Sequence, residues 1–595
     1  MPRPATKALA VAAGAAVGIA ALVWWARQQK KDSELDDEAD APPPPRTEEA
    51  APKDAATGEA VKAEFNSCKQ KAFELFKASP PRYAEAAEWF SKAIDLSIAH
   101  ETLAPQRKAL YNNRSACRER CDVLEASLED CAVVLASDPQ HAKVRRRRAR
   151  IFDKLGRNEE ALVEICADLL IQREAFKKAL QAGRQADQPT PVDNVESVMR
   201  AVGAAAAEEV LAARRASGAK FGMPSSNTIT QLLMTYAAYD SRAQAAATDN
   251  TDYATAIKGA RASGDDAETI RLLLQRADTA TYSKRYEAAR KDVELASAQK
   301  VKAEANGKQF PPELVADLER AAGLYKHLVH DLTGAAECYE RALALETSPE
   351  KRVETRVRLA GVHVDNADMA SADASLDAAL TDADGASVSD VHMHRAQLRV
   401  IRRDLEAAKN DLEACIAVAP GHVLARLRLA TVLIHSGADA HSVEEQVEAA
   451  ERLAPTMSEV YQVKGEVLLA KADLRGAIRQ FDEAIRLDES NPVPLYNKGL
   501  TLIQMNQFEA HNAQKLFESA LAVDPTCMVA LMRLSELKLQ LAASFDQAQA
   551  VVDMLGGAMQ NCRDKDELVE LSTVRAMAVA QLAAARDVGL TSFQM

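Results

Sequence analysis

Small and apolar residues recur along most of the chain at helical spacing, in paired segments with a period of about 34 residues. Paired amphipathic segments with this period are typical of a helical solenoid, in which each pair buries its apolar face against its neighbours. Only 5% of the residues are aromatic, and alanine, leucine and charged helix formers dominate. We therefore predict an all-α fold.

The pattern is most regular from about residue 310 onward, where it predicts an array of about seven repeats over 311–595. The first helix of each pair carries a small residue where the two helices approach most closely. These small residues, spaced 34 to 37 apart, are Gly323, Ala360, Ala396, Ala430, Gly465, Gly499 and Ser535. The second helix contributes another small residue and an aromatic or aliphatic residue, as in Ala477 and Phe481. Apolar spacing from 564 to 586 predicts helices that cap the array.

The same pattern predicts three repeats over 61–185. Their small and apolar positions include Ala86, Phe90, Ser115, Cys131 and Ala149. Between 186 and 310 the pattern degrades, and Asp, Thr, Ser and Gly clusters interrupt helical patches. This composition predicts connecting helices with an inserted loop near 240–265.

The segment 8–26 is nineteen residues without a charge. At helical rise it measures about 28 Å, enough to span a hydrocarbon core. A cleaved signal peptide is the alternative, but Trp24 and Trp25 stand where a small-residue cleavage site would be expected. We predict a short flank at 1–7, a transmembrane anchor at 8–26, and a disordered acidic and Pro-rich stalk at 27–60. More cations follow the span than precede it, which places the long C-terminal part in the cytosol.

The formal net charge of −13 argues against nucleic acid as a partner. The nine cysteines are scattered at positions where a helix requires a small apolar residue, which favours buried thiols in a reducing compartment. Cys117 and Cys121 lie one helical turn apart, but no second pair completes a zinc site.

The sequence contains no nucleophile elbow, phosphate loop or ligand cluster, so we expect no enzymatic activity, no cofactor and no metal. His392 and His394 are the nearest approach to a ligand pair. Because residues two apart on a helix do not share a face, we interpret them as surface histidines.

Basic and amide side chains gather on the first helices of the three N-terminal repeats. Lys143 and Arg147 lie four residues apart on one helix face, Asn113 takes the position of Arg147 in the second repeat, and Lys69 lies one position earlier in the first repeat. Because first helices line the concave side of such a solenoid, these groups should converge on one groove. Two carboxylates of an acidic peptide end would fit there.

Four consecutive arginines, Arg145 to Arg148, radiate around their helix, so only Arg147 can face this groove directly. We interpret the other three as a solvated basic turn. A nuclear-localisation or RNA-binding role is the alternative, and the predicted anchor weakens it.

The segment Asn113-Arg-Ser-Ala-Cys117 with Lys143-x3-Arg147 resembles the dicarboxylate clamp of co-chaperone tetratricopeptide domains. The resemblance implies binding of the acidic Glu-Glu-Val-Asp ends of 70- and 90-kilodalton heat-shock chaperones, with Lys69, Asn113, Lys143 and Arg147 as the clamp. The family's first repeat reads Lys-x2-Gly-Asn, whereas this chain has Phe73 in place of the asparagine. The clamp is therefore weaker, or Phe73 packs against the peptide.

The order of anchor, stalk, clamp, connecting region and array resembles the 70-kilodalton-type tetratricopeptide import receptor of the mitochondrial outer-membrane translocase. Met223-Pro-Ser-Ser-Asn-Thr-Ile-Thr230 with Tyr236 resembles that family's short segment after the clamp. The resemblance implies an outer-membrane receptor that docks chaperones, binds preproteins and contacts other translocase subunits. A groove on first helices between about 354 and 540 would hold the preprotein, and apolar residues placed for it are Tyr461, Met505, Met528 and Met532. The alternative is a scaffold or co-chaperone at another membrane, such as the endoplasmic reticulum.

Overall fold

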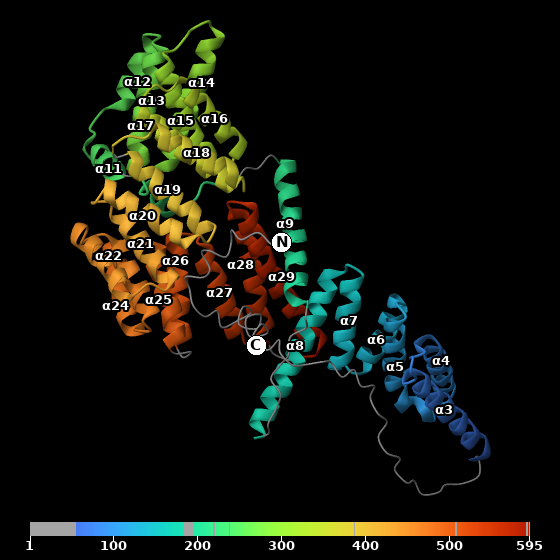
Figure 1. Cartoon of the computed structure of the whole chain (residues 1–595). Coiled ribbons are helices and arrows are strands. Elements are labelled where there is room, and N and C mark those ends of the chain that lie inside the picture. Colours follow the sequence, from blue (N-terminus) through green and yellow to red (C-terminus); the bar gives the residue numbers. More distant parts are fainter. Residues whose placement is uncertain are drawn as a thin grey trace. The chain divides into compact units, whose positions relative to one another are not determined.

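The computed structural model describes residues 55–183, 194–217, 221–236, 238–385, 387–505, 509–590 and 593. The predicted anchor at 8–26 and most of the predicted stalk lie outside these residues. Within them the chain folds into helices joined by short turns, and no strand occurs (Figure 1), which confirms the all-α prediction. One described helix, Lys565–Asp587, is long and apolar enough to cross a membrane, and half of its apolar window is buried inside the protein.

The chain forms two compact units. The described residues of the N-terminal unit are 55–183, 194–213, 535–559, 568–590 and 593, and those of the central unit fall within 214–534 and 560–567. The last helices of the chain thus group with the N-terminal repeats, whereas the sequence pattern joined them to the array at 311–595.

The N-terminal unit is built from paired helices followed by longer ones. Its helices are α3 (Ala55–Phe76), α4 (Tyr83–Ala99), η1 (Glu101–Gln106), α5 (Arg107–Arg120), α6 (Leu124–Ser137), α7 (Ala142–Lys154), α8 (Asn158–Gln181), most of α9 (Val195–Ser217), α28 (Phe545–Ala558) and most of α29 (Lys565–Asp587). The pairs are α3 with α4, α5 with α6 and α7 with α8. Helix α3 begins at Ala55, inside the segment predicted as stalk.

The central unit begins with three short helices and continues as regular pairs. The short helices are α10 (Ser226–Leu233), α11 (Tyr239–Thr248) and α12 (Tyr253–Ala262). The following helices are α13 (Asp266–Tyr282), α14 (Tyr286–Ala305), α15 (Pro312–Leu328), α16 (Leu332–Leu345), α17 (Pro349–Asp365), α18 (Met369–Asp382), α19 (Ser387–Ile401), α20 (Leu405–Val418), α21 (Val423–Ser436), α22 (Ala440–Leu453), α23 (Ser458–Ala470), α24 (Leu474–Leu487), α25 (Pro492–Met505) and α26 (Ala510–Val523), with α27 (Met528–Leu541) at its end.

From α13 to α26 each odd-numbered helix packs against the even-numbered helix that follows it. The inserted loop expected near 240–265 is wrong, because α11 and α12 occupy most of that stretch. Asp252 explains the second of these helices: its side chain caps α12 by accepting a hydrogen bond from the backbone N–H of Thr255.

A recurring local device turns the chain from the first helix of a pair into the second. The second residue after the first helix lies in the left-handed region, as at Ala367 and Arg403, with φ of 59° and 64°. The next residue is an aspartate that caps the second helix, as Asp368 and Asp404 do. Each aspartate accepts a hydrogen bond from the third residue of its helix, so an otherwise unsatisfied N–H is paired.

Close helix approach within a pair depends on glycine opposite an aromatic ring. A Cβ atom added at Gly465 would lie 2.4 Å from Cε1 of Phe481. The combinations of Gly323 with Tyr339 and Gly499 with Phe517 are equally tight, at 2.6 and 2.8 Å. The glycine therefore leaves the space that the ring fills, and all three rings are fully buried.

Candidate functional site

Arg147 is held between α7 and α5. Its Nη1 donates hydrogen bonds to the carbonyl oxygen and Oδ1 of Asn112, at 3.2 and 2.8 Å, and to Oγ of Ser115 at 2.8 Å. Its Nε lies 3.3 Å from Oε2 of Glu119, and only 11% of the side chain is exposed. The guanidinium is thus fixed in place, and sequence reasoning missed both Asn112 and Glu119 as its partners.

Asn113 lies next to this cluster on α5. The residue is only 5% exposed, and its carboxamide has no hydrogen-bond partner among the described residues. Its amide atoms are not fully buried, so solvent or a ligand can pair with them. Asn113 is therefore the predicted clamp residue whose polar group remains available.

Lys69, on α3, is half-buried and donates a hydrogen bond to Oε1 of Gln106 at 2.9 Å. Burial lowers the pKa of its ammonium group. Lys143 lies in the first turn of α7 and is exposed. The structure thus brings Arg147 into contact with Asn112 and Ser115 of α5, whereas Lys69 contacts Gln106, which precedes α5.

Phe73 packs into the core of the first helix pair. Its ring meets that of Phe90 edge-to-face, with centroids 5.4 Å apart and planes at 90°. The ring is half-buried against the apolar cluster that α3 and α4 share. This position therefore contributes packing where the related clamps have an amide donor. A contact between Phe73 and a bound peptide stays a prediction.

The interpretation of Arg145, Arg146 and Arg148 as a solvated turn is wrong. Arg145 is 3% exposed and lies 3.0 Å from Glu164, which Arg148 also contacts, at 2.9 Å. Arg146 lies 2.8 Å from Asp168. All three arginines pair with carboxylates of α8. Glu164 and Asp168 are buried in the packed face of that helix, and a buried carboxylate requires a cationic partner.

The end of α29 contacts the third helix pair inside the N-terminal unit. Arg145 Nη2 donates to the carbonyl oxygen of Asp587 at 3.3 Å, and Gln140 Nε2 donates to that of Val588 at 3.1 Å. Cations and amide donors suit the unsatisfied carbonyl groups at a helix C-terminus. Nothing in the local sequence pattern pointed to this contact, because its partners lie more than 400 residues apart.

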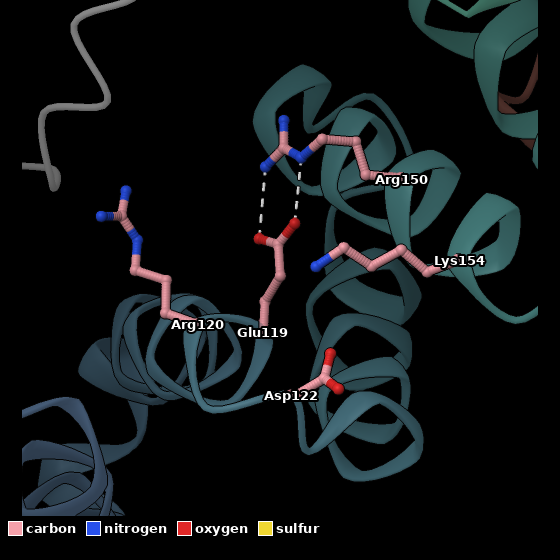
Figure 2. A pocket seen from close by; sticks show the side chains of 5 residues that line it. All are labelled: Glu119, Arg120, Asp122, Arg150 and Lys154. Carbon is pink, nitrogen blue, oxygen red and sulfur yellow. Dashed lines mark hydrogen bonds and ion pairs between the residues drawn. The ribbon is translucent and has the colours of Figure 1, made fainter.

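A pocket of about 280 Å³ lies at the C-terminal ends of α5 and α7. Glu119, Arg120, Asp122, Arg150 and Lys154 line it (Figure 2). Arg150 donates two hydrogen bonds to the Glu119 carboxylate, at 2.9 and 3.2 Å. The pocket thus adjoins Arg147, since Glu119 contacts both arginines.

The central unit contains a second pocket, of about 370 Å³. Its walls come from α10 and the first helices α15, α17 and α19, including Leu324, Val357 and Leu398. The predicted groove began near 354, so the pocket extends to earlier helices than expected. Tyr461, Met505, Met528 and Met532 do not line it, and a role for them in binding stays a prediction.

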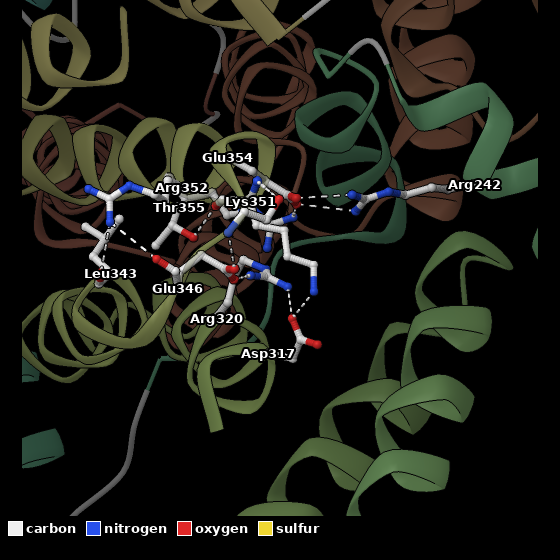
Figure 3. A network of polar contacts seen from close by, with 11 residues as sticks. Arg242, Asp317, Arg320, Leu343, Glu346, Lys351, Arg352, Glu354 and Thr355 are labelled. Atoms are coloured by element: carbon white, nitrogen blue, oxygen red, sulfur yellow. Dashed lines mark hydrogen bonds and ion pairs between the residues drawn. The ribbon is translucent and has the colours of Figure 1, made fainter. Parts of the chain in front are cut away.

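A buried ion network lies on the α17 side of this pocket (Figure 3). Glu354 accepts hydrogen bonds from Arg242 of α11, at 3.3 and 3.1 Å, and also pairs with Arg358 one turn further along α17. Although burial disfavours the charged carboxylate, the two guanidinium groups hold the pKa of Glu354 well below its usual range. The network therefore stays ionised and ties α11 to the array.

The interpretation of His392 and His394 as surface histidines is wrong. His392 Nδ1 lies 3.0 Å from Oδ1 of the buried Asp411. His394 is half-buried, with Nε2 3.1 Å from Oγ1 of Thr235 and its ring 4.6 Å from that of Tyr236. Both rings are structural: His394 fixes the chain that leaves α10.

The described residues contain no group of three or more His, Cys, Asp or Glu side chains placed to hold a metal ion. All nine cysteines are unpaired thiols, and each is buried or half-buried. This arrangement confirms the prediction of buried thiols.

Comparisons with known proteins give matches along most of the chain, although no protein-family profile matches it. The human protein named mitochondrial import receptor subunit TOM70 is 22% identical over 534 residues, which cover 88% of this chain and 80% of the relative. The subunit of the same name from Saccharomyces cerevisiae is 23% identical over 498 residues, which cover 79% of this chain and 73% of the relative. A Schizosaccharomyces pombe protein named Hsp70/Hsp90 co-chaperone is 33% identical over 88 residues, 14% of this chain and 24% of the relative.

Among solved structures, the crystal structure of yeast Tom70 aligns with 88% of this chain and 96% of its own, with 19% identity and a TM-score of 0.47. The full-length relatives from animals and yeast share one name, and they match this chain across both of its units. Over most of its length the chain is thus similar to TOM70-type import receptors.

Proposed function

We propose that this chain is a mitochondrial protein import receptor, held in the outer membrane by segment 8–26 with the rest in the cytosol. A clamp of three tetratricopeptide repeats docks 70- and 90-kilodalton chaperones by their acidic C-terminal peptide. The array of about seven repeats binds the preprotein and passes it to other translocase subunits. The shared name of the full-length relatives supports this role, and it requires binding rather than catalysis.

The observation that carries the clamp assignment is the pairing of a fixed cation with an unpaired amide. Arg147 is held within a hydrogen-bonded cluster, and Asn113, which follows Asn112 on α5, makes no side-chain hydrogen bond among the described residues. A peptide carboxylate would accept from both, and a charge-assisted bond in a pre-formed site is stronger than a neutral one. Lys143 adds an exposed cation one turn earlier on α7.

Substitution of Arg147 by alanine tests the clamp. Removal of a charge-assisted hydrogen bond costs about 1.5–3 kcal/mol, so affinity for an acidic C-terminal peptide should fall roughly 10- to 100-fold. Because Arg147 also ties α7 to α5, Arg147→Ala should be paired with Lys143→Ala, whose side chain is exposed. Titration of a fluorescent peptide measures both affinities, and circular dichroism checks the helices.

Unchanged affinity in both variants, with helical content preserved, would remove the clamp assignment. The membrane assignment is tested separately by imaging residues 1–35 fused to a fluorescent protein. A mitochondrial pattern is expected. A reticular pattern would instead favour a scaffold or co-chaperone at the endoplasmic reticulum.

A further inference from the structure

The segment 221–236, which contains α10, differs in composition from the rest of the chain. No charged residue occurs between Lys220 and Asp240, although 27% of the whole chain is charged. Apolar residues stand at helical spacing in it, as at Ile229 and Leu233, and hydroxyl and amide residues fill most of the other positions. A segment of this composition is suited to lie against other parts of the protein.

Helix α10 is not one half of a helix pair. From α13 to α26 every helix packs along a partner, whereas none of the described helices packs along α10 in this way. A helix of eight residues is marginally stable by itself. The position of α10 therefore depends on the contacts that its side chains make with the array.

One set of these contacts joins α10 to helices α13, α14 and α15. Ile229 and Leu233 are buried in the apolar cluster that these helices share. Oγ1 of Thr230 lies 2.7 Å from Oη of Tyr286, the first residue of α14. Two apolar anchors and one buried hydrogen bond thus hold this side of the segment.

A second set of contacts reaches later helices of the array. The Tyr236 ring lies 4.6 Å from that of His394 in α19 and 5.6 Å from the guanidinium carbon of Arg358 in α17. Gln231 donates a hydrogen bond from Nε2 to Glu459 of α23. The segment therefore contacts α15, α17, α19 and α23, which are all first helices. Because first helices line the concave side of such a solenoid, the segment lies in the groove of the array.

The pocket of about 370 Å³ is the space that α10 leaves in this groove. Leu232, which is 38% exposed, lines it from α10, and Leu324 and Leu398 line it from the array. Two turns of helix with their side chains, about 10 Å across and 12 Å long, fill roughly 900 Å³. The pocket therefore admits individual side chains of a ligand, but a helical segment as long as α10 would need the place that α10 holds.

We propose that segment 221–236 is an internal ligand of the array groove, and that an external segment binds along the first helices only when this one is released. The inference rests on the proposed binding of preproteins by the array and adds a means of regulation to it. An external occupant should share the chemistry of the internal one: uncharged, apolar at helical spacing, and rich in hydroxyl and amide groups. Because the internal ligand is tethered, its effective concentration is high, and it lowers the apparent affinity of any competitor.

The test uses a fluorescent peptide with the sequence of residues 221–236, added to the full-length chain in detergent. In Ile229→Ala the internal segment loses a buried anchor, so it leaves the groove more often. This variant should bind the peptide at least about tenfold more tightly than the unmodified chain. Thr230→Val, which removes the hydrogen bond to Tyr286 with little change in volume, should show a smaller gain.

Ile165→Ala is the matched control, because Ile165 is as buried as Ile229 but lies in α8 of the N-terminal unit. It should bind the peptide no better than the unmodified chain, and circular dichroism checks that every variant keeps its helices. If neither α10 variant gains affinity relative to this control, the segment is a permanent wall of the groove and the inference is overturned. An equal gain for a peptide of scrambled sequence would also overturn it, because exposed apolar surface alone would then explain the binding. A chain that passes this test but binds no preprotein would instead lose the proposed function.

Discussion

At the scale of single residues, size complementarity decides how closely the two helices of a pair approach. Where the second helix carries Phe481, the first carries Gly465, and where it carries Leu376 the first carries Ala360. The larger ring thus faces the smaller residue. The sequence pattern predicted a small residue at these positions. Only the packed structure shows which positions require glycine and which accept alanine.

Gly465→Ala tests this complementarity. The added Cβ would lie 2.4 Å from Cε1 of a fully buried ring, so the helices must separate. Overpacking costs about 1–3 kcal/mol, which exceeds the gain of up to about 1 kcal/mol from replacing a helical glycine. We expect the free energy of unfolding to fall by about 1–2 kcal/mol in urea titrations.

Two further variants provide controls for this substitution. Gly259→Ala, in α12, places a Cβ in open space and should stabilise the chain slightly. Gly465→Ala combined with Phe481→Leu recreates the Ala360 and Leu376 combination and should recover most of the loss. If the single variant proved as stable as the unmodified chain, close approach at Gly465 would not be a constraint.

At the scale of elements, α10 depends on contacts that no local pattern reveals. Ile229 and Leu233 are buried, and Thr235 and Tyr236 contact His394 of α19. The sequence resemblance singled out this segment, yet its position against the array follows only from the tertiary structure. The histidines were misread for the same reason, since their partners come from α10 and α20.

The His394 contact predicts a pH dependence. Burial lowers the pKa of His394 to about 4, whereas the ring in the unfolded chain takes up a proton below about 6.5. The unfolded state therefore binds more protons between these values, and stability falls as the pH falls through this window. Between pH 7 and pH 5 this residue should contribute a loss on the order of 1–2 kcal/mol.

Urea unfolding at pH 7 and pH 5 measures this loss, and His394→Gln should show a smaller difference between the two. His422, whose pKa burial also lowers, accounts for part of the remaining dependence. Most carboxylates titrate below this range, and buried ones whose pKa is raised, such as Glu164, Asp168 and Glu466, change stability in the opposite direction. An identical loss of stability in the variant would exclude His394 as its source.

At the scale of the whole molecule, the sequence predicted the helical pairs well because each pair repeats the same spacing of small residues. The loop predicted at 240–265 is mostly helical, because the Asp252 side chain caps α12 within this polar stretch. The sequence pattern also treated Arg145 to Arg148 as a surface feature, because the two buried acids of α8 that pair with them are evident only after packing.

Only part of the geometry of the candidate site follows from the sequence. Spacing along α7 identified the face that carries Lys143 and Arg147, and helical geometry alone is sufficient for that. The partners of Arg147 on α5 and the pocket beyond it require the packing of two repeats, which no single helix encodes. The grouping of the last helices with the N-terminal unit depends on contacts between residues more than 400 positions apart.

The most direct test of the account compares one acidic peptide in two forms, with a free C-terminal carboxylate and with a C-terminal amide. The proposed clamp would require the terminal charge, so the full-length chain should bind the free form at least tenfold more tightly, as expected for the loss of a charge-assisted contact. Lys143→Ala should reduce that ratio. Equal binding of the two forms would contradict the assignment of this chain as a receptor that docks chaperones by their C-terminal end.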